Sequence, residues 1–536
     1  RPPGFIITLP GPPPCMGQSA SSRLTESPPA LVGGISAATD YTADLPDDCL
    51  ALVFQSLGPG DRKRCSLVCR RWLAVEGRSR LRLELDARAA LLDVVPAIFA
   101  RFDAISRLTL RCSSRTDSIG DDGLALVAAR CPNLSSLKLR ACGALTDAGM
   151  AAVARYCSGL RKLSVSYCAF GAKGVDAVLR GCPLLEDLSI KRLCGLQDPS
   201  ATADLVAGAA SLRSICLKDL YNAQCFAPLI AGCPNLKTLK LTRCFGDWDP
   251  LLKNMAARVP GIVEIHLERL QVTDSGLAAL SVCVDLEVLR LVKTPECTDA
   301  GLAAVADRCA LLRKVHIDGW RANRIGDEGL QALARRCAGL QELVLIGVNP
   351  TSRTLELMAS NCRSLERLAL CGSDTFGDAE VACIASKCAA LKKLCIKRCP
   401  ISDQGMEALA AGCPKLVKVK VKRCSGVTSE CADRLAASRN GKLAVNVEPE
   451  EGSVAVQQAE GTVVFGEFGI AEDTGGGERP RLASVDRAGA AGPLSSKSRR
   501  TARKKRAGFF ASRRNLVASA LRRWSNGSSY SRHSHR

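Results

Sequence analysis

The feature of this sequence that most restricts its fold is a unit of about 26 residues that recurs from about residue 105 to residue 439. Its clearest copy runs from Cys131 to Cys157 and begins Cys-Pro-Asn-Leu-Ser-Ser-Leu-Lys-Leu-Arg-Ala-Cys. The leading cysteine recurs at Cys131, Cys157, Cys182, Cys233, Cys283, Cys309, Cys337, Cys362, Cys388 and Cys413, and Ala209 and Val259 replace it in two more units. Because a single unit cannot bury its own apolar side, we expect the units to stack into a solenoid with one continuous core.

Each unit predicts one short strand and one helix. In the clearest copy, Leu137 and Leu139 alternate with polar residues, the period of a strand with one buried face. The stretch from Met150 to Cys157 has apolar residues at helical spacing, and the preceding Thr146-Asp147 suits a helix N-terminus. With a divergent unit around residues 108–110, the pattern predicts an α/β horseshoe of 12 to 13 repeats over residues 86–440.

Residues 44–85 show a different pattern, that of two or three short amphipathic helices. Pro46 suits the first turn of a helix, and two apolar stripes follow with a spacing of three and four residues. The stripes consist of Leu50, Val53, Phe54 and Leu57, then Cys65, Val68, Cys69 and Trp72. A unit of this size needs a partner surface for stability, which is either another protein or the first repeat that it would cap.

Both ends of the chain read as disordered. The leader, residues 1–43, is rich in Pro, Ser and Gly; a translation start at Met16 would place Gly17 in the pattern for myristoylation, although a short motif also arises by chance. The tail, residues 441–536, is acidic and then strongly basic, with 15 Lys and Arg against one acid from residue 481 onwards. The basic part is compatible with nuclear import, with contact to anionic lipid or nucleic acid, or with a solvated tail.

The composition argues against several classes of function. The net charge of +21 resides mostly in the tail, so it does not indicate a nucleic-acid-binding fold. There are 28 Cys but only four His and no C-x2-C pair, so we expect buried, reduced thiols and no metal site. The sequence contains neither a Walker A loop nor a G-x-S-x-G motif, and we predict no catalytic residues and no cofactor.

The motifs resemble two families. Leu45-Pro46, Leu50, Phe54, Leu57 and Cys65-Ser66-Leu67-Val68-Cys69-Arg70-Arg71-Trp72 resemble an F-box, which implies docking on a Skp-type adaptor of a cullin complex. The resemblance assigns that docking to Leu45, Pro46, Leu50, Val53, Val68 and Trp72. The repeats resemble the cysteine-containing class of leucine-rich repeats, and the whole is similar to the plant VIER F-box group. The unit at Ala209 departs from the pattern, because it lacks both the cysteine and the Thr-Asp-x-Gly linker.

The resemblance implies a non-catalytic, substrate-recognising subunit of a Skp-cullin-F-box ubiquitin ligase, whose protein substrate is then degraded by the proteasome. Two alternatives remain: a receptor for a hormone or other small molecule, and a scaffold held at a membrane or on nucleic acid by the basic tail. We expect the protein in the cytoplasm or nucleus, with peripheral attachment to the plasma membrane if Gly17 is lipidated.

The outward-facing strand residues are the candidates for substrate binding. The last two strands place five lysines on adjacent strands, where like charges repel and an acidic partner would relieve the repulsion: Lys393, Lys397, Lys418, Lys420 and Lys422. The group around His266 is interpreted as a solvated polar face rather than a metal site. Six aromatic residues are expected in the loops that follow the strands, as anchors for protein partners: Tyr167, Phe170, Tyr221, Phe245, Trp248 and Trp320.

Overall fold

The computed structural model describes residues 42–113, 117–196, 209–319, 324–438 and 443–448. The chain divides into one unit that spans Arg1–Gly452 and a second that spans Ser453–Arg536, and every described residue belongs to the first. Four features predicted above therefore lie outside the described residues: the start at Met16, the lipidation site at Gly17, Trp320 and the basic tail.

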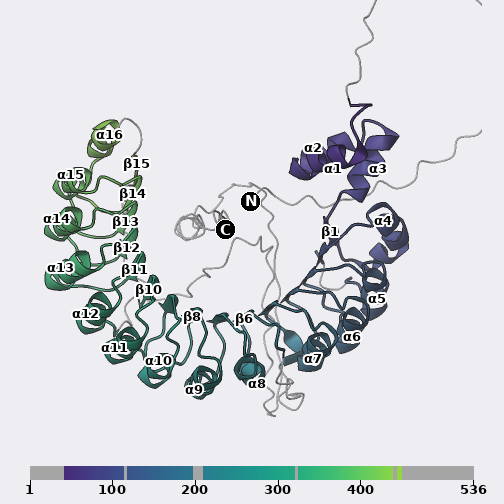
Figure 1. Ribbon diagram of the computed structural model, residues 1–536, viewed down its shortest axis with the longest axis horizontal. Helices are drawn as coiled ribbons and strands as arrows, with labels where there is room; N and C mark the ends of the chain where they lie inside the picture. The colour runs from purple at the N-terminus through teal and green to yellow at the C-terminus, as the bar shows by residue number, and fades with distance from the viewer. Residues whose placement is uncertain (1–41, 114–116, 197–208, 320–323, 439–442, 449–536) are drawn as a thin grey trace, which may run out of the picture. The chain divides into compact units, whose positions relative to one another are not determined.

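The described strands form one parallel sheet in which the strands follow one another in chain order (Figure 1). They are β1 (Arg82–Asp86), β2 (Arg107–Arg111), β3 (Ser136–Arg140), β4 (Lys162–Ser166), β5 (Asp187–Lys191), β6 (Ser214–Lys218), β7 (Thr238–Thr242), β8 (Glu264–Glu268), β9 (Val288–Val292), β10 (Lys314–Asp318), β11 (Glu342–Ile346), β12 (Arg367–Cys371), β13 (Lys393–Lys397), β14 (Lys418–Lys422) and β15 (Ala444–Glu448). Strands β2 to β14 are the 13 expected repeats. The sheet also includes β1 and β15, so it continues past residue 440.

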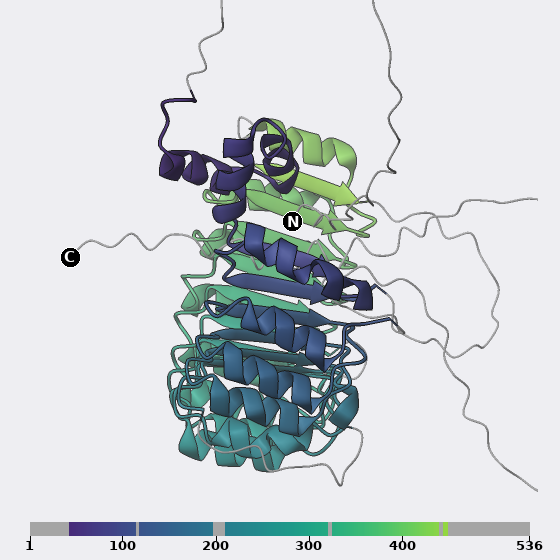
Figure 2. The ribbon, with the colours of Figure 1, turned by 90° about the vertical axis from the view of Figure 1, so that its right-hand side faces the viewer.

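The helices lie on the outer side of the curved sheet, and the strands line its inner, concave side (Figures 1 and 2). Three helices precede the sheet: α1 (Asp47–Ser56), α2 (Pro59–Cys65) and α3 (Arg70–Arg78). The helices between the strands are η1 (Ala89–Val94), α4 (Val95–Arg101), α5 (Asp121–Ala129), α6 (Asp147–Tyr156), α7 (Ala172–Gly181), η2 (Cys194–Leu196), η4 (Ala223–Phe226), α8 (Ala227–Ala231), α9 (Asp249–Arg258), α10 (Asp274–Leu280), α11 (Asp299–Arg308), α12 (Asp327–Arg336), α13 (Ser352–Asn361), α14 (Asp378–Lys387), α15 (Asp403–Gly412) and α16 (Ser429–Ser438). The divergent unit at Ala209 has the shortest of these α-helices, α8.

The repeat core is built from the inward strand residues and the repeat cysteines. Leu137 and Leu139 are buried while their outward neighbours are half-exposed, which confirms the alternation predicted for β3. Each of the ten repeat cysteines is at most 3% exposed. In successive repeats the thiol donates to the carbonyl oxygen of the preceding repeat's cysteine: the Sγ–O distance is 3.3 Å from Cys309 to Cys283 and 3.7 Å from Cys337 to Cys309. The cysteine is therefore a buried inter-repeat contact as well as a packing residue.

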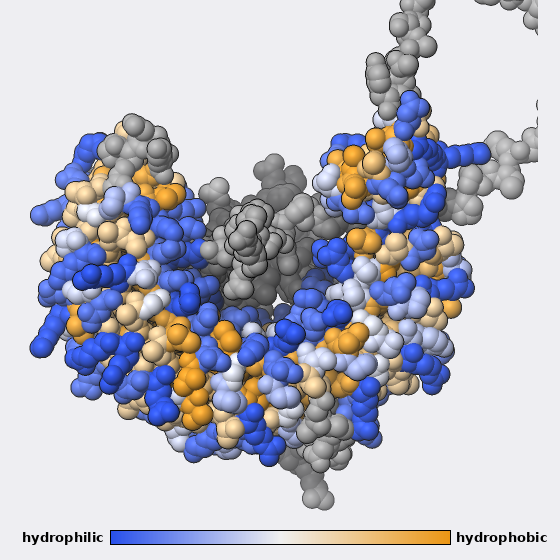
Figure 3. Space-filling view, in the orientation of Figure 1, coloured by the Kyte–Doolittle hydropathy of each residue, from blue (hydrophilic) through white to orange (hydrophobic). Residues whose placement is uncertain are grey.

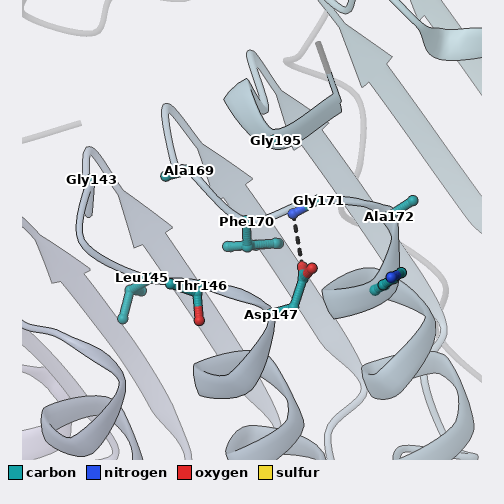
Figure 4. Close-up of a pocket in the computed structure, with 10 residues that line it drawn as sticks. Gly143, Leu145, Thr146, Asp147, Ala169, Phe170, Gly171, Ala172 and Gly195 are labelled. Atoms are coloured by element: carbon teal, nitrogen blue, oxygen red, sulfur yellow. Dashed lines mark hydrogen bonds between the residues drawn. The ribbon is translucent and has the colours of Figure 1, made fainter. Parts of the chain in front are cut away.

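In many repeats a carboxylate at the start of the helix also joins neighbouring repeats, as Asp147 does (Figure 4). Asp147 Oδ1 accepts hydrogen bonds from the backbone N–H groups of Gly171 and Gly174 in the next repeat, both at 2.8 Å. Asp274 does the same with Thr298, whose N–H lies 2.7 Å from Oδ1 and whose hydroxyl lies 2.6 Å from Oδ2. These bonds satisfy donors that a helix N-terminus leaves unpaired, which explains why Thr-Asp-x-Gly recurs.

Most strands end in a residue with left-handed backbone conformation, which turns the chain out of the sheet. The φ angle is 55° at Asp219, 51° at Arg243 and 52° at Arg269, and a glycine takes this position at Gly347 and Gly372. These turns form one rim of the sheet. Among the described residues, no helix combines the length and apolar character that a bilayer crossing requires.

Candidate functional site

The helices α1 to α3, here called the helical unit, have a small core of their own. Leu50, Phe54 and Val75 are at most 3% exposed, and the Trp72 ring packs edge-on against Phe54 with a centroid distance of 5.3 Å. Leu45 also packs against this core. Of the six residues predicted to dock an adaptor, Leu50 is therefore a core residue, and Leu45 and Trp72 contribute to the same packing.

Other apolar residues of the helical unit face outward (Figure 3). Val53 on α1 is 47% exposed and Val68, between α2 and α3, is 63% exposed. Leu52 and Leu67 are 66% and 77% exposed, and the sequence interpretation missed both because they lie beside the helical stripes rather than within them. Exposed apolar residues concentrated on a unit this small are typical of a protein-binding surface.

The last turn of the helical unit is joined to the first repeat through one buried carboxylate. Glu76 on α3 has no exposed surface, and three guanidinium groups surround it. Arg62 and Arg101 lie 3.3 Å from its oxygens, and Arg80 forms a further ion pair. Burial, partly offset by Glu76, lowers the pKa of Arg62. Since Arg101 belongs to α4, this cluster ties the helical unit to the repeats.

The same junction leaves little space for movement. A side chain added at Gly77 would lie 2.6 Å from the Arg101 carbonyl oxygen, so α3 and the end of α4 are in direct backbone contact. The guanidinium groups of Arg80 and Arg101 also lie 5.0 and 4.8 Å from the centre of the Phe102 ring. The helical unit therefore has a defined attachment to the first repeat.

The structure brings the five predicted lysines together on β13 and β14; we call Lys393, Lys397, Lys418, Lys420 and Lys422 the lysine surface. Lys393 pairs in register with Lys418, and Lys397 pairs with Lys422. Burial, followed by the positive charges of Arg367 and Lys418, lowers the pKa of Lys393. Burial and then the charges of Lys418 and Lys422 lower the pKa of Lys420. The crowding of positive charge expected from the sequence is thus present.

One of the five lysines has an acidic partner that the sequence interpretation missed. Lys422 is 6% exposed, and its Nζ lies 2.5 and 2.6 Å from the two carboxylate oxygens of Glu448 on β15. The predicted boundary at residue 440 had placed Glu448 in the tail, where no strand was expected. The charge of Lys422 is therefore compensated within the chain.

The middle of the concave side carries two histidines that are neutral at physiological pH. Burial lowers the pKa of His266 to about 4, and burial together with the charge of Arg290 lowers the pKa of His316 to about 3. His266 Nε2 lies 2.7 Å from Glu264 Oε1, which in turn lies 3.2 Å from Lys240. Within the described ranges, no cluster of His, Cys, Asp and Glu has the arrangement of a metal site.

Two of the predicted aromatic anchors are in fact core residues. Trp248 has no exposed surface and donates from Nε1 to the Cys244 carbonyl oxygen at 3.1 Å, and Phe170 is 2% exposed. The prediction was wrong for these two because the loops fold back over the ends of the repeats. Tyr221 and Phe245 do face the solvent, at 69% and 64% exposure.

A shallow pocket lies between the turns that precede α6 and α7 (Figure 4). Its lining is mostly backbone and small side chains around Phe170, and its carboxylate, Asp147, already accepts two backbone hydrogen bonds. The geometry explains this pocket as a gap between two stacked turns.

Comparison with known families gives a match in the helical unit and a match in the later repeats. Residues 43–82 match the F-box domain, and residues 327–438 match the leucine-rich repeats described as "FBD-associated F-box protein At5g56370, LRR repeats". The resemblance to an F-box followed by leucine-rich repeats is thereby confirmed. The narrower resemblance to the VIER group stays a prediction.

Similar curated proteins come from plants. The chain is 25% identical to Transport inhibitor response 1-like protein Os11g0515500 of Oryza sativa subsp. japonica, over 57% of this chain and 61% of that protein. It is 27% identical to F-box/LRR-repeat protein 12 of Arabidopsis thaliana, over 23% of this chain and 41% of that protein. The chain thus covers less than two thirds of the length of each of these two relatives. With GRR1-like protein 1 of Arabidopsis thaliana, identity is 26% over 69% of this chain and 72% of the relative.

Solved structures that match this chain include an internalin, inlF, of Listeria monocytogenes, with a TM-score of 0.44, 16% identity and coverage of 67% of this chain and 94% of that one. The yeast complex of Rad7 and Elc1 gives a TM-score of 0.43 at 16% identity, with coverage of 74% and 92%.

Proposed function

We propose that this chain, an F-box domain followed by leucine-rich repeats, is the substrate-recognising subunit of a Skp-cullin-F-box ubiquitin ligase. The observation that carries the proposal is the attachment of a helical unit with exposed apolar side chains to an array of repeats in one chain. Val53 and Val68 of the helical unit face the solvent, and the Glu76 cluster attaches this unit to repeats that carry half-buried lysines on β13 and β14. The similarity to F-box and leucine-rich-repeat relatives supports a role of this kind in general.

In the proposed mechanism the chain performs no bond chemistry. The helical unit binds a Skp-type adaptor, and through it a cullin, while the repeats hold a protein substrate. Holding two reactants in one assembly raises their effective concentration, so ubiquitin transfer becomes faster without a catalytic residue in this chain. A defined attachment between the two surfaces matters because the substrate must stay within reach of the transferred ubiquitin.

For the adaptor surface we propose Pro46, Val53 and Val68, with Leu45, Leu50 and Trp72 holding the core that presents them. Truncating Leu45 would also disturb that core, so the sharper variant changes only solvent-facing residues, Val53→Glu with Val68→Glu. This double variant should no longer co-purify with a recombinant Skp-type adaptor. Two exposed leucines of the repeats provide the matched control, Leu184→Glu with Leu311→Glu, which should co-purify normally. Undiminished binding by V53E/V68E would refute the adaptor assignment.

For the substrate we propose that an acidic protein segment binds the lysine surface. Opposite charges speed the encounter and are screened by salt, with a Debye length of roughly 8 Å at physiological ionic strength. Lys422 is buried against Glu448, so the variant reverses three half-buried lysines instead, K393E/K418E/K420E. It should strongly reduce capture of substrates that accumulate on proteasome inhibition, and adaptor binding should persist. The variant K173E/K253E/K415E changes net charge equally at exposed lysines elsewhere and should capture substrates normally. Equal capture by both triple variants would contradict the proposal.

The proposal includes location in the cytoplasm or nucleus, with peripheral membrane attachment if Gly17 is lipidated. Imaging of a C-terminally tagged chain that starts at Met16, with and without Gly17→Ala, tests this. If the chain with Gly17 is found at the plasma membrane and the Gly17→Ala variant is not, the result supports the lipid anchor. The same distribution for both chains would contradict it.

A further inference from the structure

Two aromatic rings stack on each other in the solvent at one rim of the sheet. Tyr221 follows β6 and Phe245 follows β7, and they are 69% and 64% exposed. Their ring centroids are 5.3 Å apart and their planes differ by 9°, so together they present a flat apolar surface. Exposed apolar area is unfavourable in water, so an exposed aromatic pair suggests a binding role.

The other repeats show that the fold does not require aromatic residues at this position. After most of the strands the chain passes through a left-handed or turn residue, then a buried residue, then an exposed one, as in Asp219-Leu220-Tyr221 and Arg243-Cys244-Phe245. In the other described turns of this form, the exposed position holds a small, polar or proline residue: Gly143, Ala169, Cys194, Gln271, Pro295, Asn349, Asp374, Pro400 and Ser425. The neighbouring repeats thus show that the turn forms without an aromatic residue at this position.

The surroundings of the pair carry an excess of positive charge. Lys191 and Lys218 face each other in register on β5 and β6, and burial together with the charge of Lys191 lowers the pKa of Lys218. The nearby carboxylate of Asp219 already forms ion pairs with Arg243 at 2.7 Å and Arg192 at 3.5 Å. Four cations, Lys191, Lys218, Arg192 and Arg243, therefore lie around this carboxylate, with Glu268 as a second nearby acid. Lys191 Nζ also lies 5.2 Å from the centre of the Tyr167 ring. Positive charge is in excess at this place.

We propose that the Tyr221–Phe245 pair and the Lys191–Lys218 pair form a docking site for an acidic segment of a partner protein that presents an aromatic side chain. The aromatic side chain packs against the stacked rings, and the acidic residues face the two lysines. This site lies on β5 to β7, separate from the lysine surface on β13 and β14. The inference that the partner is a ubiquitination substrate rests on the function proposed above. The inference that the site binds an acidic segment with an aromatic side chain is independent of that function.

The test uses the full chain and a displayed library of random dodecapeptides. Panning should enrich sequences that combine Asp or Glu with Phe, Tyr or Trp. An enriched peptide is then titrated against the wild type and against Y221Q/F245Q, in which both rings become the Gln that the next repeat carries as Gln271. Because buried aromatic anchors dominate interfaces, affinity should fall on the order of 10-fold or more.

Two further variants test whether the loss of affinity is specific to the aromatic pair and whether the two lysines contribute to binding. Tyr156→Gln removes a 42%-exposed aromatic side chain from the outer helix α6 and should leave peptide affinity unchanged. K191E/K218E should weaken binding and reduce its dependence on salt. An affinity loss in Y221Q/F245Q that equals that of Tyr156→Gln would overturn the proposal, as would enrichment of peptides without acidic residues.

The outcomes separate this proposal from the proposed ligase function. Adaptor co-purification by Y221Q/F245Q should be normal, and K393E/K418E/K420E should bind the selected peptide normally. A chain that fails to bind an adaptor yet binds these peptides would sink the ligase assignment and leave the docking site intact. Binding of a single-stranded RNA oligomer that depends on the aromatic pair, with no peptide enriched, would overturn the assignment to a protein partner.

Discussion

Replacing Glu76 with Gln should loosen the helical unit from the repeats. The carboxylate is fully buried and faces three guanidinium groups, so its neutralisation leaves three cations around an amide of the same size. Removing one partner of a buried ion pair typically costs about 3–5 kcal/mol. The arginine side chains retain some solvent contact, 14% for Arg62, 18% for Arg80 and 41% for Arg101, which places the expected loss near the lower end, at about 3 kcal/mol.

Native-state hydrogen exchange measures this loss where it occurs. A cost of about 3 kcal/mol corresponds to roughly a hundredfold increase in the open population, and amides of α3 should exchange faster by that factor. Amides of β9 to β12, far along the repeats, should exchange at the wild-type rate, because each repeat contacts only its neighbours.

An exposed ion pair provides the matched control for Glu76. Glu407 and Arg434 are about 60% exposed and 3.1 Å apart, so Glu407→Gln should cost about 0.5 kcal/mol or less. If Glu76→Gln accelerates exchange in α3 by less than about fivefold, or accelerates the repeats equally, the Glu76 cluster does not anchor the helical unit, and this reasoning is refuted.

Three further predictions concern the repeats. Gly174→Ala places a methyl group 2.6 Å from Asp147 Oδ1 and should cost about 1–3 kcal/mol in urea unfolding, whereas Gly159→Ala, which meets nothing within 4 Å, should cost close to nothing; equal effects would contradict the tight inter-repeat contact. Burial raises the pKa of Cys283 to about 12, so iodoacetamide at pH 8 should alkylate this thiol slowly in the native protein and quickly after unfolding. The exposed Cys49 and Cys69 should react quickly in both the native and the unfolded protein. Rapid labelling of Cys283 in the native protein would contradict the packing. The pKa of His266 falls from 6.5 to about 4 on folding, so between these pH values the unfolded chain binds more protons than the folded chain. The melting temperature should therefore decrease as the pH drops from about 6.5 to 4, and it should depend less on pH in H266Q/H316Q. The same pH dependence in the variant and the wild type would indicate that these histidines are not buried as described.

The fold could be predicted from the sequence because its signals are local and repeated. The alternation around Leu137 and Leu139 and the helical spacing from Met150 to Cys157 involve residues a few positions apart, and repetition in successive units removes the ambiguity of any one copy. The helix start at Thr146-Asp147 is equally local. The helical unit and the repeat solenoid were therefore predicted correctly, while the sheet includes one strand before and one strand after the 12 to 13 expected repeats.

The candidate sites were only partly predictable, because spacing shows which residues share a face but not what covers that face. Trp248 and Phe170 occupy loop positions in the sequence, yet the loops fold over the repeat ends and bury both rings. Leu50 belongs to the stripe that resembles an adaptor-binding motif, and packing against Phe54 and Val75 makes it a core residue. Glu448 was missed because its strand is recognisable only by its pairing with β14.

By itself, the sequence determined the repeat period, the buried face of each strand, the helix starts and the cluster of lysines on the last two repeats, because each of these depends on neighbours along the chain. Only the tertiary structure decided which apolar residues of the helical unit face outward, how Glu76 gathers three arginines, and that Tyr221 and Phe245 stack in the solvent. Those arrangements join residues from 4 to 25 positions apart through space. Their energies depend on burial and on the geometry of facing groups, which no spacing rule contains.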